Sequence, residues 1–232
     1  MKILALSLLT LAAVPLLAVA AACERVAGAR PPLVVELYTS EGCSSCPPAD
    51  RWLSTLKGRD DVLPLAFHVA YWDRLGWADR FATRENTDRQ YALARAMGAP
   101  NVYTPQVVAQ GEDWRRWPAL PSRVAAAPMP LKLLRDGDRV VAEVGAAPGR
   151  WTGYWVVLED GHRSRVSAGE NRGETLAHDH VVRLYRPVGE WQGAQSFTLP
   201  LPPDDPAHPR RVAFVIAGAA DLRPVQALSL GC

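Results

Sequence analysis

The feature that most constrains the fold is a pair of cysteines between a strand pattern and a helix pattern. Residues 33–38 (LVVELY) are mostly apolar, as expected for a buried parallel strand. A turn at residues 39–42 leads to Cys43-Ser44-Ser45-Cys46, and residues 49–56 then carry apolar side chains on one helical face. A second apolar run at residues 62–69 completes a strand–helix–strand unit, which predicts a parallel sheet.

The position of the two cysteines predicts redox chemistry. The start of a helix has N–H groups without partners and a partial positive charge, and both lower the pKa of a thiol. We therefore expect Cys43 to be the attacking thiolate and the more exposed cysteine, and Cys46 to be a shielded resolving cysteine. The hydroxyls of Ser44 and Ser45 are expected to donate hydrogen bonds to the thiolate. A C-x-x-C motif in this strand–turn–helix context is typical of a thioredoxin-like redox site.

The rest of the first half continues the pattern of helices and strands. Residues 71–76 look like a loop, residues 85–97 predict a helix ended by Gly98, and residues 106–109 predict a third strand that Pro105 precedes. A proline-rich segment at residues 117–130 predicts a short helix between prolines, followed by a domain boundary.

The second half has the pattern of an all-β domain. Asp136-Gly137 is a hairpin signal between residues 131–134 and 139–144. Further short strands are predicted at residues 154–158, 181–185, 196–199, 212–216 and 225–230. The expected fold is an α/β thioredoxin-like N-terminal domain (residues 31–128) plus an all-β, sandwich-like C-terminal domain (residues 129–232). The junction lacks a Gly/Ser linker, so we expect the two domains to pack together.

The first residues predict export. A short positive start, an uncharged apolar run and small residues at positions 20–22 form the pattern of a signal peptide over residues 1–22, and the protein is expected to be periplasmic or secreted. The segment Ala20-Ala21-Ala22-Cys23 also resembles a lipoprotein box, which would anchor the protein to a membrane through Cys23. Ordinary cleavage leaves Cys23 free to pair with Cys232.

Several segments together resemble a known family. These are VVELYTSEGCSSCPPAD (34–50), AFHVAYWDRLGWADRFA (66–82), RQYA (89–92), VYTPQVV (102–108), GENRGETL (169–176) and VVRL (181–184). They are similar to domain-of-unknown-function family 1223, described as exported bacterial proteins with a thioredoxin-like fold, over residues 33–230. The resemblance implies a cis peptide bond between Thr104 and Pro105, beside the cysteines. The chain departs from the family at Ala70, where an acidic residue is expected.

Other polar residues have less certain roles. Aligning on Cys43 places Leu37 where thioredoxins bury an acid, so Glu36 is expected to be a structural carboxylate on the opposite face of the strand. His68, Tyr71, Trp72 and Asp73 either line the active-site cleft or form a capped aromatic loop. The loop of Glu170, Asn171 and Arg172, with His178 and His180 nearby, is interpreted as a charged hairpin turn rather than a cover over the cysteines.

These observations predict a thiol–disulfide oxidoreductase that acts on protein or small-molecule thiols and disulfides. Its expected catalytic residues are Cys43, Cys46, Thr104 and Pro105, with no cofactor and no metal. Two alternatives stay open: a soft-metal protein that holds copper with Cys43, Cys46 and His68, and a non-enzymatic binding module with a structural disulfide. The net charge of +2 does not indicate the strongly basic surface that binds nucleic acid, so we expect no nucleic-acid partner.

Overall fold

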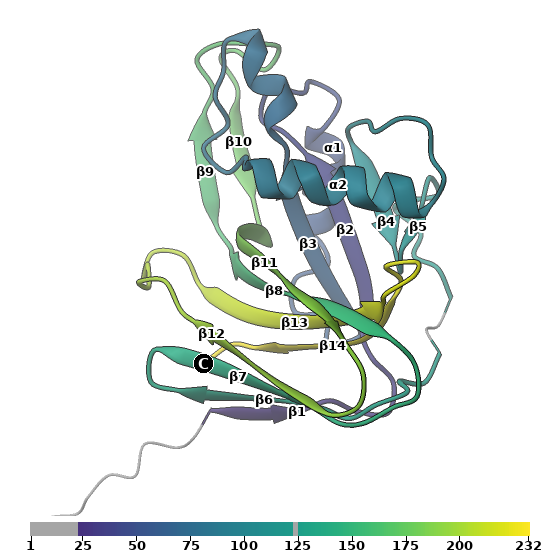
Figure 1. The fold of residues 1–232 in the computed structure, drawn as a ribbon. Helices are drawn as coiled ribbons and strands as arrows, with labels where there is room; N and C mark the ends of the chain where they lie inside the picture. Colours follow the sequence, from purple (N-terminus) through teal and green to yellow (C-terminus); the bar gives the residue numbers. More distant parts are fainter. Residues whose placement is uncertain (1–22, 123–124) are drawn as a thin grey trace, which may run out of the picture.

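The computed structural model describes residues 23–122 and 125–232. Figure 1 shows helices and several strands in its upper part and a pair of facing sheets in its lower part. An eight-stranded sheet runs through both parts in the order β14-β13-β8-β11-β3-β2-β4-β5. The predicted signal peptide, residues 1–22, lies outside the described residues.

The cysteine pair lies at the end of a strand–helix–strand unit. Strands β2 (Leu33–Thr39) and β3 (Val62–His68) pair in parallel, and helix α1 (Pro47–Ser54) connects them. Strand β4 (Gln106–Ala109) pairs with β2 in the antiparallel direction, and β5 (Glu112–Asp113) pairs with β4. β2 and β3 are buried along their whole length, which explains why their sequences are nearly continuous apolar runs.

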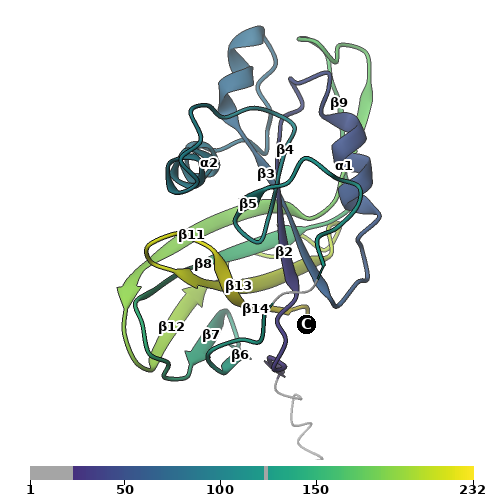
Figure 2. The ribbon, with the colours of Figure 1, turned by 90° about the vertical axis from the view of Figure 1, so that its right-hand side faces the viewer.

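Helices cover the two faces of β2 and β3, as Figure 2 shows from the side. On one face, Val35 and Leu37 pack with Trp52 and Leu53 of α1. On the other face, residues of β2 and β3 pack with Leu93 of helix α2 (Arg84–Ala96). Alternation along the strand therefore places Glu36 on the α2 side of the sheet, opposite Leu37.

The second half of the chain, together with strand β1 from the start of the described chain, forms two sheets that pack face to face. One contains β8 (Trp151–Glu159), β11 (Val181–Trp191), β13 (Arg210–Gly218) and β14 (Pro224–Leu230), all in the eight-stranded sheet. The other contains β1 (Glu24–Val26), β6 (Leu131–Asp136), β7 (Arg139–Val144) and β12 (Gln195–Pro200). Apolar side chains from both sheets, such as Leu131, Leu133, Trp155 and Phe214, form one core.

The two halves are joined through the sheet. Strand β11 pairs in parallel with β3 at Val181 and Ala66, and the Ala66 N–H donates to the His180 carbonyl over 2.8 Å. A separate antiparallel hairpin, β9 (His162–Arg165) and β10 (Thr175–His178), rises beside α1. The halves are therefore in direct contact, and no stretch of described chain acts as a free tether between them.

Three local expectations differ from the structure. Residues 70–75 form a 3-10 helix, η1 (Ala70–Leu75), and not a loop. The described part of residues 117–130 contains turns and no helix, because its prolines lie too close together for a helix interior. The strands β9 and β10 are absent from the sequence-based prediction, which includes only the hairpin turn between them.

A disulfide joins the ends of the described chain. Cys23 and Cys232 are bonded, with their Cα atoms 6.1 Å apart. This is the pairing expected for ordinary cleavage of the predicted signal peptide. Among the described residues, no helix has the length and apolar character needed to cross a membrane.

Candidate functional site

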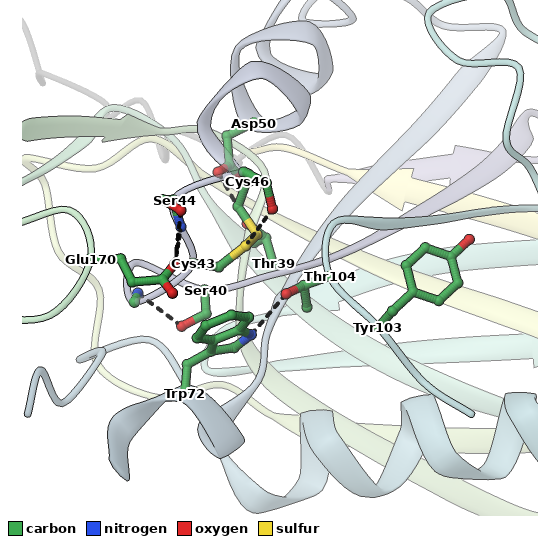
Figure 3. Close-up of a disulfide and its surroundings, with 12 residues drawn as sticks. Thr39, Ser40, Cys43, Ser44, Cys46, Asp50, Trp72, Tyr103, Thr104 and Glu170 are labelled. Carbon is green, nitrogen blue, oxygen red and sulfur yellow. Dashed lines mark hydrogen bonds between the residues drawn. A yellow bond between two sulfur atoms is a disulfide. The ribbon is translucent and has the colours of Figure 1, made fainter. Parts of the chain in front are cut away.

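The second disulfide lies where the sequence predicts the redox pair. Cys43 and Cys46 are bonded, with their Cα atoms 5.4 Å apart. They occupy the turn between β2 and α1 (Figure 3). Both cysteines are 0% exposed. The expectation that Cys43 is the more exposed of the two is therefore wrong for the oxidised protein, because other parts of the chain cover it.

Helix α1 begins at Pro47, so the helix start lies next to Cys46 and not at Cys43, where the redox prediction expects it. Cys46 is the N-cap of α1. The first two residues of the helix are Pro47 and Pro48, which carry no N–H group. The next two N–H groups, of Ala49 and Asp50, donate to the Cys46 carbonyl. Few free helix-end donors thus remain to stabilise a Cys43 thiolate. The nearest side-chain donor is the Ser45 hydroxyl, whose oxygen lies 3.4 Å from Cys43 Sγ.

The Thr104–Pro105 segment lies at the same end of β2 as the cysteines. Its peptide bond is cis, and the pairing of Tyr38 with Gln106 fixes its position along β2. Trp72 Nε1 donates to Thr104 Oγ1 over 2.8 Å. A Cβ atom at Gly42 would lie 3.0 Å from the Trp72 Cβ, so glycine allows this close approach without a shift of Trp72. Trp72 therefore lines the candidate site, whereas Tyr71 points to Gln90 of α2.

A loop from the second half of the chain covers the cysteine turn. Glu170 accepts hydrogen bonds from the Ser44 N–H (3.0 Å) and the Ser44 hydroxyl (2.8 Å), and these bonds lower the pKa of Glu170. Asn171 is buried, and its Nδ2 donates to the carbonyls of Glu41 (2.8 Å) and Cys43 (3.0 Å). Figure 3 shows Glu170 directly beside Ser44. This segment is the turn of the β9–β10 hairpin, as interpreted from the sequence, and it also covers the cysteine turn, which that interpretation did not include; we call residues 169–173 the cover loop.

Buried charged side chains lie behind the turn, and sequence reasoning missed most of them. His68 Nδ1 lies 2.6 Å from Asp79 Oδ2, which also accepts from the Glu41 N–H. His178 Nε2 lies 3.3 Å from Glu41 Oε1, and the rings of His68 and His178 meet edge to face. Asp73 accepts from the Asp79 N–H and so helps to position Asp79. The only sequence signal for this cluster was the group of polar residues around His68.

The His68–Asp79 pair favours the charged form of both side chains. Burial alone would raise the pKa of Asp79, but the charge and hydrogen bond of His68 outweigh it and lower the pKa to about 2. Burial alone would lower the pKa of His68, but Asp79 more than compensates, so the pKa rises above its ordinary value. A buried ion pair of this kind links the stability of the site to pH.

The pair predicts a pH window for stability. The Asp79 contribution is complete above the ordinary Asp pKa of 3.8 and disappears as the pH falls through about 2. The His68 contribution is complete below 6.5 and disappears as the pH rises through the elevated His68 pKa. We expect Asp79→Asn to lower the free energy of unfolding by on the order of 2 kcal/mol between these limits, and by less outside them. Urea unfolding of both proteins from pH 3 to 9 measures this, and a difference independent of pH would contradict it.

Glu36 is a structural carboxylate, as expected. It accepts from Arg89 Nε (2.9 Å) and Nη2 (2.5 Å), and also from the hydroxyls of Tyr38 and Tyr154. The Arg89 guanidinium lies 4.0 Å from the centre of the Tyr154 ring. All four residues are buried, so Glu36 is fully paired and faces away from the cysteines.

The described residues contain no group of three or more His, Cys, Asp or Glu side chains arranged to hold a metal ion. For the copper alternative, the two sulfurs are joined to each other in a disulfide, and His68 uses Nδ1 for Asp79 while its buried Nε2 has no hydrogen-bond partner within the described residues. Arg172 is exposed, and His180 Nδ1 contacts Arg211, away from the cysteine turn. Of the residues singled out from the sequence, the structure brings together Cys43, Cys46, Thr104, Trp72, Glu170 and Asn171.

Two solved structures are similar to this chain. The crystal structure of protein AGR_C_4864 from Agrobacterium tumefaciens shares 29% sequence identity with a TM-score of 0.67, covering 88% of this chain and 96% of that one. HBP35 of Porphyromonas gingivalis shares 15% identity with a TM-score of 0.56, covering 87% of this chain and 75% of that one, and at this identity the likeness concerns the fold alone.

The family comparison agrees with the resemblance seen in the sequence. Among curated proteins, none matches the chain. A family model described as a protein of unknown function, DUF1223, matches residues 34–217. Because this match covers most of the sequence, the chain belongs to the DUF1223 family.

Proposed function

We propose that the protein is an exported, thioredoxin-like thiol–disulfide oxidoreductase that uses Cys43 and Cys46. The observation that carries the proposal is a disulfide between residues three apart, in a strand-to-helix turn that faces a cis-proline segment. The strand order β3-β2-β4, with β4 antiparallel and one helix on each face, supports the thioredoxin-like assignment. The leader pattern at residues 1–22 and the two disulfides support export, because disulfides persist in oxidising compartments.

The proposed reaction follows from the positions of the two sulfurs. In the reduced protein, the Cys43 thiolate attacks one sulfur of a substrate disulfide, forms a mixed disulfide and expels the other sulfur as a thiolate. Cys46 then loses its proton and attacks Cys43 Sγ, which restores the Cys43–Cys46 bond and releases the second substrate thiolate. Two electrons pass from the protein to the substrate, and the reverse sequence oxidises a substrate dithiol.

A trapping experiment tests the assignment of roles. Reduced Cys46→Ser protein, in a Cys23→Ser/Cys232→Ser background, is incubated with glutathione disulfide and analysed by intact mass. We expect one stable glutathionyl adduct on Cys43, because no resolving thiol remains. The matched Cys43→Ser protein is expected to form far less adduct, because the proposed roles make Cys46 the resolving cysteine, which attacks only the mixed disulfide on Cys43. Adduct formation only in Cys43→Ser would reverse the roles, and no exchange in any variant would end the oxidoreductase proposal.

The complete burial of the disulfide favours one second candidate, a binding module in which the bond is structural. Reduction decides between them. A structural disulfide resists dithiothreitol until the protein unfolds, whereas a redox-active one is reduced in the folded state and reoxidises reversibly. Thiol alkylation under native conditions, followed by peptide mapping of Cys43 and Cys46, distinguishes the two.

A further inference from the structure

Asp50 lies one helical turn after Cys46 and differs from the other buried acids of the site. Its N–H donates to the Cys46 carbonyl over 3.2 Å, so the two side chains share the first turn of α1. Its carboxylate is buried, and Thr39 Oγ1 donates to Oδ2 over 3.0 Å. Figure 3 shows Asp50 and Thr39 close to Cys46.

The other acids nearby are already paired with basic or donor groups. Glu41 lies beside His178 and accepts a hydrogen bond from Trp77 Nε1. Asp79 is bonded to His68 and accepts a hydrogen bond from the Glu41 N–H. Within residues 23–122 and 125–232, Asp50 has no ion-pair partner, and the Thr39 hydroxyl is its one side-chain hydrogen bond. A buried carboxylate without a basic partner is expensive, and neutralisation by a proton relieves the cost.

We propose that Asp50 accepts the proton of the Cys46 thiol when Cys46 attacks the mixed disulfide on Cys43. The proposal rests on the proposed oxidoreductase function. In this step the Cys46 S–H bond breaks, and its proton passes to the Asp50 carboxylate. The new Cys46–Cys43 bond forms as the substrate thiolate leaves Cys43, so charge and electrons balance. Asp50 later returns the proton to water.

The environment of Asp50 suits this transfer. Burial raises the pKa of Asp50, and the neighbouring rings of His178 and His68 and the Thr39 hydroxyl offset only part of the rise, while Asp79 adds to it. These groups come from β10, β3 and β2 and from the segment after η1, so they surround the carboxylate on several sides. A carboxylate with an elevated pKa lies closer to a thiol in proton affinity and is a better proton acceptor for it.

The test separates the two steps of one turnover. Reduced protein in the Cys23→Ser/Cys232→Ser background is mixed with one equivalent of 5,5′-dithiobis(2-nitrobenzoic acid), and thionitrobenzoate release is followed by absorbance. Attack by Cys43 releases the first thionitrobenzoate in a concentration-dependent phase. Attack by Cys46 releases the second in a phase independent of concentration. We expect Asp50→Asn to slow the second phase about a hundredfold and to leave the first nearly unchanged.

Two controls make the result specific. Glu159→Gln removes another buried carboxylate, one paired with Arg210 and His162, and is expected to leave the second phase unchanged. In the protein with Asp50 intact, the second phase should rise with pH and level off below the ordinary thiol pKa of about 8.5. If Asp50→Asn does not fold, this profile decides alone: a rate that rises without levelling through the thiol range overturns the proposal.

The outcomes distinguish this inference from the function on which it rests. If the protein with Asp50 intact releases no second thionitrobenzoate, the oxidoreductase proposal fails together with this one. If it releases both and folded Asp50→Asn releases them at the same rates, only the role of Asp50 is overturned. A selective loss of the second phase in Asp50→Asn, with Glu159→Gln unaffected, establishes the proton transfer.

Discussion

Replacing Arg89 by methionine is expected to lower the free energy of unfolding by about 3–5 kcal/mol, because Glu36 would remain buried without its partner. Glu36 and Arg89 are both nearly inaccessible and share two hydrogen bonds. Methionine keeps the apolar stem of the side chain but removes the guanidinium that lies over Tyr154. Urea unfolding followed by circular dichroism measures the loss.

The same helix supplies the control. Arg84 is exposed, and its Nε lies 3.6 Å from Asp88, so Arg84→Met is expected to change stability by about 0.5 kcal/mol or less. Glu36→Gln added to Arg89→Met removes the unpaired charge and should recover part of the lost stability, while Gln can still accept from Tyr38 and Tyr154. If Arg89→Met and Arg84→Met cost the same, the buried pair does not hold α2 on the sheet.

The second large effect concerns access to the disulfide. Asn171→Ala removes the Nδ2 donor to the carbonyls of Glu41 and Cys43; the Cys43 carbonyl still accepts from the Cys46 N–H, but the Glu41 carbonyl loses its hydrogen bond. Leaving such a group without a partner costs about 1–3 kcal/mol. Since about 1.4 kcal/mol corresponds to a factor of ten, opening of the cover loop should become roughly ten- to a hundredfold more frequent. We expect reduction of Cys43–Cys46 by a phosphine reductant to accelerate by a similar factor.

Arg172→Ala is the matched control, because Arg172 belongs to the same loop and its side chain is exposed. Reduction is followed by quenched alkylation and peptide mapping of the two cysteines. An unchanged rate in Asn171→Ala would mean that the cover loop does not limit access, and the burial of Cys43 would then need another cause.

Much of the fold could be predicted because burial and apolar sequence coincide. The run at residues 62–68 and the Asp136-Gly137 turn correspond to β3 and to the β6–β7 hairpin. The β9–β10 hairpin does not follow that rule. Its inward residues alternate as expected for strands, but they include His162, Ser164 and His178, so the apolar signal is absent.

The candidate site could be predicted only where its residues adjoin in sequence. Cys43 and Cys46 are recognisable from their spacing. Asn171, in contrast, donates to the Cys43 carbonyl although the two residues are 128 positions apart in the sequence. The role of Asp79 depends on His68, and that of Asp50 on its burial beside Thr39. A single sequence has no local pattern for such long-range pairing of buried polar groups.

The bond between Cys23 and Cys232 turns residues 23–232 into a covalent ring. One proteolytic cut anywhere inside such a ring opens it without separating any pieces. A protease that cleaves in the proline-rich connection near residues 117–130 should therefore leave a single band in non-reducing electrophoresis, and two bands once reductant is added. Fragmentation patterns of this protein thus report on the state of the outer disulfide as much as on the site of cleavage.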